Sequence, residues 1–259
     1  MSGLITRLFR IAQPSAPKKP QRARLAYDPS EIAAVYAIGD VHGCYDQLIE
    51  IERRIVSDGD TVEGRKLIVL LGDYVDRGPR SSEVLDHLCL PPPEGFERIA
   101  ICGNHDEAFL DFLTVSQPGN AWLNLGGQET LHSYGVDFEY LMRHGRVADV
   151  AAAARYAVPA HHIEFLRAMP IALSIGDLVF VHAGIKPGVP MREQTDEDLM
   201  WIREPFLSQG PGLPILVIHG HTPDQKPVFG NDRICIDTAA YATGNLTALK
   251  IAQGNLWIL

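Results

Sequence analysis

Several features that would place a chain in a broad class are missing from this sequence. Its 259 residues include four cysteines with no Cys-x-x-Cys spacing, and Cys102 and Cys235 lie in apolar runs, so we expect reduced core thiols. No apolar run reaches the roughly 18 residues that a membrane-spanning helix needs. The first twelve residues lack the apolar core of a secretory signal. We therefore expect a cytoplasmic protein without a transmembrane segment.

A surplus of basic residues is missing too. The formal net charge of −9 excludes a body that binds nucleic acid through its phosphates. Residues 1–30 are the exception, because Lys and Arg are common there and the first acidic residue is Asp28. This stretch is expected to be a basic, flexible arm with two open interpretations: it docks a membrane surface or a partner, or it is a solvated tail.

The remaining residues, 31–259, are predicted to form one α/β domain. With 46% hydrophobic residues, the chain can bury a large core. Apolar runs separated by amphipathic stretches predict three parallel strands joined by two helices. The expected strands cover residues 33–38, 66–71 and 97–102, and the expected helices cover residues 46–56 and 81–88.

Two changes of pattern follow along the chain. Residues 106–169 are predicted to be a helical section that caps or walls a crevice, with helices over 107–115, 127–133, 138–143 and 161–168. After Pro170, strands are expected over 171–175, 178–181, 215–219, 233–236, 246–251 and 256–259, with a short helix over 199–203. No linker separates the two halves, so we expect a single domain.

Five short polar motifs organise the chain, and each follows an apolar run with the pattern of a buried strand. They are Gly39–Gly43, Gly72–Gly78, Gly103–Asp106, Val181–Gly184 and His219–Thr222. Ligands in open α/β sheets bind at the carboxyl ends of strands. We therefore expect the polar side chains of all five motifs to meet in one crevice.

Six of these side chains form a set that suits metal ions. Asp40, His42, Asp73, Asn104, His182 and His221 offer imidazole, carboxylate and carboxamide ligands, which favour Mn, Fe and Zn. Six ligands are too many for one catalytic ion that must keep an open position, but they fit two ions that share a carboxylate. Asp73 is the expected bridge. Asp40 and His42 would complete one site, and the other three residues would complete the second.

Four further side chains are expected to act on the substrate. Arg77 and Arg203 can bind phosphate oxygens, because a guanidinium matches phosphate with two parallel hydrogen bonds. His105 follows a predicted ligand directly and is placed to protonate a leaving alkoxide, with Asp76 holding its tautomer. For His219 two roles stay open, a direct one and one that supports a neighbouring ligand.

Together the motifs resemble the signatures of the phosphoprotein phosphatase family, in its bacterial and phage branch, within the calcineurin-like metallophosphoesterases. The family's GDxHG, GDxxDRG and GNH(E/D) sequences stand here at Gly39–Gly43, Gly72–Gly78 and Gly103–Asp106. Its His-Ala-Gly and Gly-His pieces match His182–Gly184 and Gly220-His221. The resemblance covers residues 33–252. It implies a central β-sandwich flanked by helices.

The resemblance implies the same roles for the site residues. Two divalent ions, usually Mn²⁺ with Fe or Zn also found, would share Asp73, and a hydroxide bridging them would attack phosphorus directly. Arg77, Arg203 and Asn104 would contact the phosphate. His105, supported by Asp76, would protonate the leaving oxygen.

Departures from the family pattern bear on the substrate. The third signature ends in Asp106, where protein phosphatases usually have Glu and the related symmetrical diadenosine tetraphosphate hydrolases have Asp. His42 and Asp76 point toward protein phosphatases, because those hydrolases tend to lack both. Ala239 stands where Gly is common but touches no predicted ligand.

We therefore expect a hydrolase of phosphate monoesters, with phosphoserine or phosphothreonine in proteins as its main substrate and phosphotyrosine as a further one. The alternative is a dinucleoside polyphosphate hydrolase of the diadenosine tetraphosphate type, or another nucleotide phosphohydrolase. A metal-binding scaffold without activity is disfavoured, because no expected ligand is missing. A nuclease is disfavoured, because the acidic body offers no basic track to a phosphodiester backbone.

Overall fold

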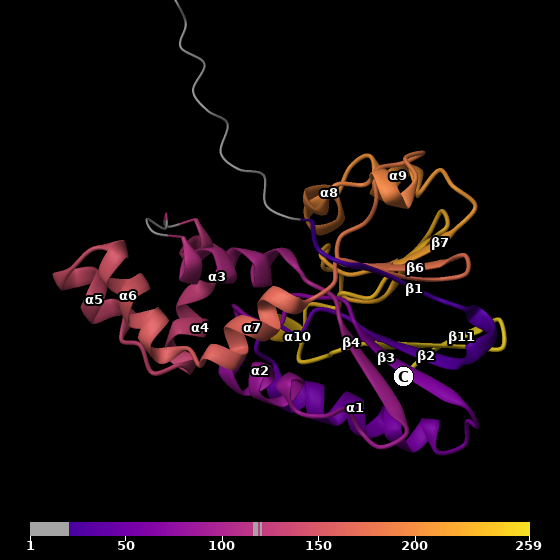
Figure 1. The fold of residues 1–259 in the computed structure, drawn as a ribbon, viewed down its shortest axis with the longest axis horizontal. Coiled ribbons are helices and arrows are strands. Elements are labelled where there is room, and N and C mark those ends of the chain that lie inside the picture. The colour runs from indigo at the N-terminus through magenta and orange to yellow at the C-terminus, as the bar shows by residue number, and fades with distance from the viewer. Residues whose placement is uncertain (1–20, 116–118, 120) are drawn as a thin grey trace, which may run out of the picture.

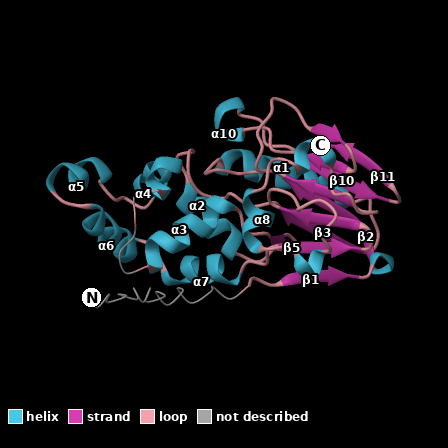
Figure 2. Ribbon diagram, turned by 90° about the horizontal axis from the view of Figure 1, so that it is seen from above, coloured by secondary structure: helices cyan, strands magenta, loops and turns pink. Residues whose placement is uncertain are grey.

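Two β-sheets face each other at the centre of the fold, and helices lie outside them (Figures 1 and 2). The computed structural model describes residues 21–115, 119 and 121–259. This mixed α/β architecture matches the expected sandwich flanked by helices. In the described part of the chain, no helix combines the length and the apolar character that crossing a membrane requires.

The five-stranded sheet contains the parallel run that the sequence predicts. Its order is β11-β10-β2-β3-β4, with β2 (Ile32–Ile38), β3 (Arg65–Leu70) and β4 (Phe96–Ala100) parallel to one another. Antiparallel β10 (Ala248–Ala252) and β11 (Asn255–Ile258) extend it beyond β2. The connecting helices α1 (Tyr45–Gly59) and α2 (Ser81–Cys89) match the expected ones. The chain therefore returns to the same sheet edge after each helix, which is what brings the first three motifs together.

The six-stranded sheet has the order β1-β5-β6-β7-β9-β8. Its members are β1 (Arg24–Tyr27), β5 (Ala172–Ile175), β6 (Leu178–Val181), β7 (Leu216–His219), β8 (Val228–Gly230) and β9 (Arg233–Cys235). The strands predicted over 171–175 and 178–181 are confirmed as β5 and β6, which pair antiparallel around the turn at Gly176-Asp177. Strands β6 and β7 are parallel, so His182 and the turn after His219 emerge at one edge.

Strand β1 lies inside the stretch that was assigned to the basic arm. It pairs in parallel with β5, and Arg24 forms an ion pair of 2.8 Å with Asp196. The Arg22 guanidinium donates a hydrogen bond to the carbonyl of Leu166. The folded domain therefore begins before residue 31, because edge pairing and a partly buried ion pair hold these residues. The docking role expected for the arm falls on residues 1–20, which lie outside the described residues.

The core between the sheets comes from the inward-facing residues of both. Val35, Ala37, Leu67 and Val69 of the five-stranded sheet pack in one cluster with Leu173, Phe180 and Ile218 of the six-stranded sheet. All of these side chains are buried. Since burying an aliphatic side chain is worth about 1.5–3 kcal/mol, this layer fixes the two sheets, and hence the two sets of motifs, relative to each other.

The helical section, which links β4 to β5 along the chain, contains one α-helix more than predicted. It comprises α3 (Asn104–Thr114), a 3-10 turn at Trp122–Leu125, α4 (Gly127–Ser133), α5 (Phe138–His144), α6 (Val147–Ala157) and α7 (Ala160–Ala168). Helix α6 was missed: its Ala-rich sequence lacks a strong apolar stripe, although alanine is the best helix former. Short helices α8 (Asp196–Trp201), α9 (Phe206–Gln209) and α10 (Ala240–Thr243) and 3-10 turns at Pro29–Glu31 and Met191–Glu193 complete the fold.

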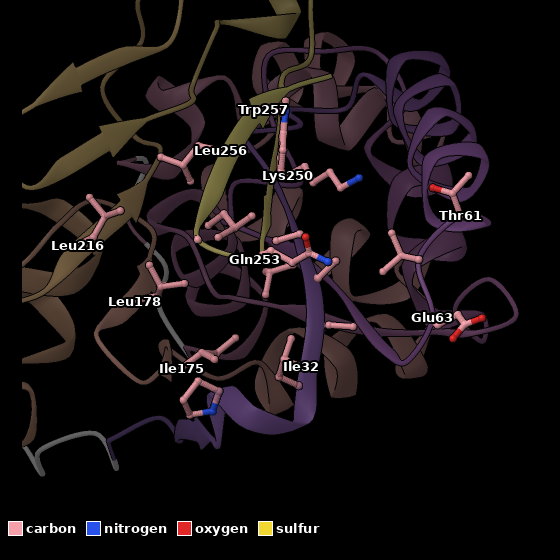
Figure 3. Close-up of a pocket in the computed structure, with 18 residues that line it drawn as sticks. Ile32, Thr61, Glu63, Ile175, Leu178, Leu216, Lys250, Gln253, Leu256 and Trp257 are labelled. Atoms are coloured by element: carbon pink, nitrogen blue, oxygen red, sulfur yellow. The ribbon is translucent and has the colours of Figure 1, made fainter.

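A cavity of about 870 Å³ opens at the end of the sandwich that lies away from the motifs (Figure 3). Ile32, Leu178 and Leu216 line it, and each stands at or near the amino end of its strand. Trp257 of the β10–β11 hairpin closes one side. The motifs follow the carboxyl ends of these strands, so this cavity is separate from the site.

Candidate metal centre

The structure brings the polar residues of all five motifs to one place. Asp40, His42, Asp73, Asn104, His105, His182 and His221 are each at most 7% exposed. They follow the carboxyl ends of β2, β3, β4, β6 and β7, in loops except for Asn104 and His105, which begin α3. The prediction that the five strand ends converge is therefore confirmed.

The loops hold these residues in unusual backbone conformations. His42, Asp73, Asp76, Arg77 and His221 all have positive φ, between 44° and 72°. Non-glycine residues rarely adopt this region, and such strain persists where the surrounding structure imposes it, typically at functional sites. Here the strain turns the side chains back toward one another at the sheet edge.

Glycines make room for the carboxylates. A Cβ atom at Gly103 would collide with the carboxylate of Asp73, and one at Gly220 would collide with the carboxylate of Asp40. Both positions therefore require glycine because a carboxylate lies too close to leave room for a side chain, and not because the chain must be flexible there.

Two backbone carbonyls define the tautomers of two imidazoles. Nδ1 of His182 lies 2.8 Å from the carbonyl oxygen of Leu71, and Nδ1 of His42 lies 2.8 Å from that of Val75. A carbonyl only accepts, so each Nδ1 carries the proton. In the neutral rings, both Nε2 atoms therefore present lone pairs. They face Oδ2 of Asp73 at 3.4 Å for His182 and 3.6 Å for His42.

The second group of donors surrounds the side-chain oxygen of Asn104. This oxygen lies 2.8 Å from Nε2 of His182 and 2.8 Å from Nδ1 of His221. Potential ligand atoms of Asp73, His182 and His221 all lie within 4.8 Å of one another, and so do those of His42, Asp73 and His105. Asp73 belongs to both clusters. Convergence of lone pairs and carboxylate oxygens at one point is the donor chemistry of a cation site.

Electrostatics at the cluster also favour a cation. Burial lowers the pKa of His182, but the charges of Asp73 and Asp40 outweigh it and raise the pKa to about 10. Burial lowers the pKa of His42 and of His221 to about 3, so both rings stay neutral. The carboxylates thus attract a positive charge, while two of the three imidazoles keep free lone pairs.

A buried carboxylate that the motif analysis overlooked adds to this charge. Asp237 is 1% exposed, and its Oδ2 has no hydrogen-bond partner among the described residues. Burial and the charge of Asp237 raise the pKa of Asp40. The carboxylate of Asp40 accepts the backbone N–H of His221 at 3.0 Å. Asp237 lies two residues past the last residue of β9, so its position near a strand end was the available signal.

His105 and Asp76 form the expected pair. Nδ1 of His105 donates to Oδ2 of Asp76 at 2.7 Å. Burial lowers the pKa of His105, but the charges of Asp73 and Asp76 raise it overall. The pair therefore holds a proton on Nδ1 and favours a second one on Nε2.

The part of the helical section that lies beyond the third motif fixes Asp76. Nε1 of Trp122 donates to Oδ2 of Asp76 at 2.9 Å, and the hydroxyl of Thr130 donates to Oδ1 at 2.8 Å. Sequence reasoning missed both residues, because contacts across about 50 positions leave no local pattern. The section thus positions an acid–base pair as well as walling the site.

Two arginines stand at the edge of the cluster. The guanidinium of Arg77, the sixth residue of the GDxxDRG motif, lies 2.9 Å from Nε2 of His42 and 3.1 Å from Nε2 of His105. Arg203 lies past the end of α8, where Nη2 is 3.5 Å from the carbonyl oxygen of His221. The helix predicted over 199–203 therefore begins and ends earlier than expected, and Arg203 lies in the segment after it. Both cations lie within reach of a ligand seated on the cluster.

The ring of His219 does not face the cluster. Its Nδ1 lies 3.0 Å from the carbonyl of Gly220, and its Nε2 lies 3.4 Å from the guanidinium of Arg233. Of the two roles left open for His219, the geometry favours support of the neighbouring turn.

Asp106 holds the motif loops together. Its carboxylate accepts three backbone N–H groups, those of Asp73 (2.8 Å), Tyr74 (2.9 Å) and Gly103 (2.9 Å). Asp106→Ala leaves these buried donors without an acceptor, at about 1–3 kcal/mol each. We expect the free energy of unfolding in urea to fall by about 3–5 kcal/mol, and by less for Asp106→Asn, which keeps one acceptor. A loss below about 1 kcal/mol for Asp106→Ala would contradict this role.

Similarity to known proteins identifies the family of this chain. The family model described as calcineurin-like phosphoesterase matches residues 33–250. The chain belongs to this family. It is a phosphoesterase, and the family implies divalent metal ions, which the His and Asp clusters can hold.

Relatives of this phosphoesterase carry two kinds of name. It is 28% identical over 237 residues to an asymmetrical bis(5'-nucleosyl)-tetraphosphatase of Bacillus velezensis, a match that covers 83% of this chain and 88% of that protein. It is 28% identical over 226 residues to serine/threonine-protein phosphatase 2 of Salmonella typhimurium, covering 84% and 92%. A crystal structure of a candidate diadenosine tetraphosphatase superposes with a TM-score of 0.62 at 19% identity, covering 92% of this chain and 97% of that one. This last likeness concerns the fold alone.

Proposed function

We propose that this phosphoesterase hydrolyses dinucleoside polyphosphates with two divalent ions, Mn²⁺ being our first choice. One ion would be held by Asp40, His42 and Asp73, and the other by Asp73, Asn104, His182 and His221. Several of the relatives are named as asymmetrical bis(5'-nucleosyl)-tetraphosphatases. The sequence placed a protein phosphatase first and a dinucleoside polyphosphate hydrolase as the alternative, and the names of these relatives favour that alternative.

The observation that carries the substrate class is an aromatic rim beside the cluster. Trp201 is 45% exposed, and its ring centroid lies 6.1 Å from that of His221. Tyr241 is 39% exposed, 5.4 Å from the ring of His42, and lies under the guanidinium of Arg77 at 4.9 Å. Partly exposed aromatic side chains beside His221 and His42 suit stacking of nucleobases, which is worth about 1–3 kcal/mol per base.

The chain's own residues then divide the work of hydrolysis. When bound, the two ions supply Lewis-acid polarisation of phosphoryl oxygens and an activated water. Arg77 and Arg203 bind the non-bridging oxygens and offset the charge that grows on them. His105 can give the proton on Nε2 to a leaving oxygen that is basic enough to need it, while its Nδ1–H stays on Asp76. No covalent enzyme intermediate is needed.

A second candidate is the phosphoprotein phosphatase that the sequence analysis placed first. The pair of His105 and Asp76 favours it. A seryl or threonyl alkoxide is strongly basic and needs a proton in order to leave, whereas a nucleotide phosphate leaves readily without one. The named similarity to a serine/threonine-protein phosphatase agrees with this candidate.

A competition assay separates the two candidates. The purified chain with Mn²⁺ would receive equal amounts of diadenosine tetraphosphate and a phosphothreonine peptide, with products identified by mass. We expect preferential cleavage of the dinucleotide into ATP and AMP. Two molecules of ADP would still support a dinucleoside polyphosphate hydrolase, but one that cleaves the central phosphoanhydride bond. Dephosphorylated peptide beside intact dinucleotide would overturn the proposal in favour of the second candidate.

Substitution of Trp201 tests the aromatic rim. We expect Trp201→Ala to raise KM for diadenosine tetraphosphate about 10- to 100-fold through lost stacking, with little change in turnover of a phosphothreonine peptide. Trp257→Ala is the matched control, because Trp257 is also 45% exposed but lies on β11, away from the site. Equal KM values for wild type and Trp201→Ala would show that Trp201 of the aromatic rim does not contribute to substrate recognition.

A further inference from the structure

A second group of metal-ligand side chains lies on the helical side of the molecule. Potential ligand atoms of Cys89, His161 and His162 all lie within 4.8 Å of one another. Oδ1 of Asp86 is 3.0 Å from Nε2 of His162 and 3.8 Å from Nε2 of His161. Asp86 and Cys89 stand one helical turn apart at the end of α2, and the two histidines lie in the first turn of α7. We propose that these four residues form a zinc site that fastens α7 to α2.

The donor set matches zinc in number and kind. One thiolate, two imidazoles and one carboxylate make four ligands, and zinc sites in proteins are typically four-coordinate with sulfur and nitrogen donors. None of the four residues belongs to the motifs of the metal centre. The site is therefore separate from it and requires no residue used there.

The surroundings orient one ligand and leave an entry path. His162 is 1% exposed, and its Nδ1 lies 2.8 Å from the hydroxyl of Tyr134. A hydroxyl both donates and accepts, so Nδ1 can carry the proton and leave Nε2 free for an ion, the arrangement that metal-binding histidines commonly show. The side chains of His161 and Asp86 are 59% and 62% exposed, so an ion reaches the site from solvent.

A bound ion would stabilise the part of the helical section that serves the catalytic pair. The ring of Tyr134 packs 6.1 Å from Phe109, and Phe109 stacks on Trp122 at 4.9 Å. Trp122 donates to Asp76. This row of rings connects the zinc site to the residue that orients His105. The expected consequence is greater stability of the helical section, since an ion that binds only the folded state shifts unfolding by mass action.

Cobalt spectroscopy on the full chain tests the proposal with a readout other than activity. After removal of metals with a chelator, Co²⁺ would be titrated in and the sulfur-to-cobalt charge-transfer absorption recorded. The centre built from the motifs contains no cysteine, so this band reports the new site alone. We expect the band in wild type, its loss in Cys89→Ser, and at least a tenfold weaker affinity in His161→Asn.

A histidine outside the proposed zinc site provides the control. His132→Gln should keep the band, because His132 is an exposed histidine of the same section that pairs with Glu139 instead. His161→Asn is preferred to a change at buried His162, which risks the fold. No band in wild type, an unchanged band in Cys89→Ser, or a band that appears only at millimolar Co²⁺ would each overturn the proposal. Zn²⁺ should also displace Co²⁺ and raise the unfolding temperature of wild type more than that of Cys89→Ser.

Discussion

Asp73→Asn is expected to lower turnover of every phosphate substrate by about 10³-fold or more, because in the proposed centre its carboxylate would hold both ions, and each ion would be worth several kcal/mol in the transition state. Oδ2 of Asp73 faces the Nε2 atoms of His42 and His182. An amide nitrogen placed there would donate to those nitrogens and compete with metal binding. Steady-state kinetics and the bound metal after dialysis, measured by elemental analysis, would report the loss.

The fold should survive this substitution. Oδ1 of Asp73 accepts the backbone N–H of His105 at 3.0 Å, and an amide oxygen can do the same. Asp177→Asn, at an exposed turn between β5 and β6, is the control for the loss of one carboxylate. Asp73→Asn protein that keeps two ions per chain and wild-type turnover would contradict the bridging role.

The second large effect is expected at His105. His105→Asn removes the proton donor while leaving the metal ligands in place, and general acid catalysis typically contributes about 10²–10⁴-fold. The loss should reach this size for alkyl phosphates, whose leaving oxygens are strongly basic. It should be about tenfold or less for p-nitrophenyl phosphate and for dinucleotides, whose leaving groups depart without a proton.

A series of phosphate esters with leaving groups of rising pKa would measure this dependence directly. We expect a steeper fall of kcat with leaving-group pKa in His105→Asn than in wild type. Asp76→Asn should give the same pattern in weaker form, because His105 loses the partner that holds its proton. Equal losses on aryl and alkyl phosphates would show that His105 does not act as the acid.

The sequence predicted which residues converge at the sheet edges, because a local pattern marks each of them. Each of the five motifs pairs an apolar strand with a glycine-bearing turn, and parallel strands carry their ends to one edge. Asp106 shows the same logic, since its carboxylate caps the very loops that the motifs form. The predicted strands of the five-stranded sheet and the β5–β6 hairpin followed from the same alternation of apolar runs and turns.

What the sequence did not reveal depends on contacts between distant segments. Trp122 and Thr130 reach Asp76 across about 50 residues, and nothing in their own surroundings marks them. Asp86 and His162 meet across 76 positions. Strand β1 is four residues long and is stabilised by pairing with β5, a partner almost 150 residues later. Such features come from the fold as a whole, so no local pattern predicts them.

In the proposed centre, Asp73 joins two ions. Electron paramagnetic resonance of metal-free protein titrated with Mn²⁺ tests it most directly, because ions about 3.5–4 Å apart are magnetically coupled. We predict two bound Mn²⁺ ions per chain at the centre, the multiline signal of a coupled pair, and loss of that coupling in Asp73→Asn. A signal of isolated Mn²⁺ throughout the titration, unchanged in Asp73→Asn, would contradict the claim.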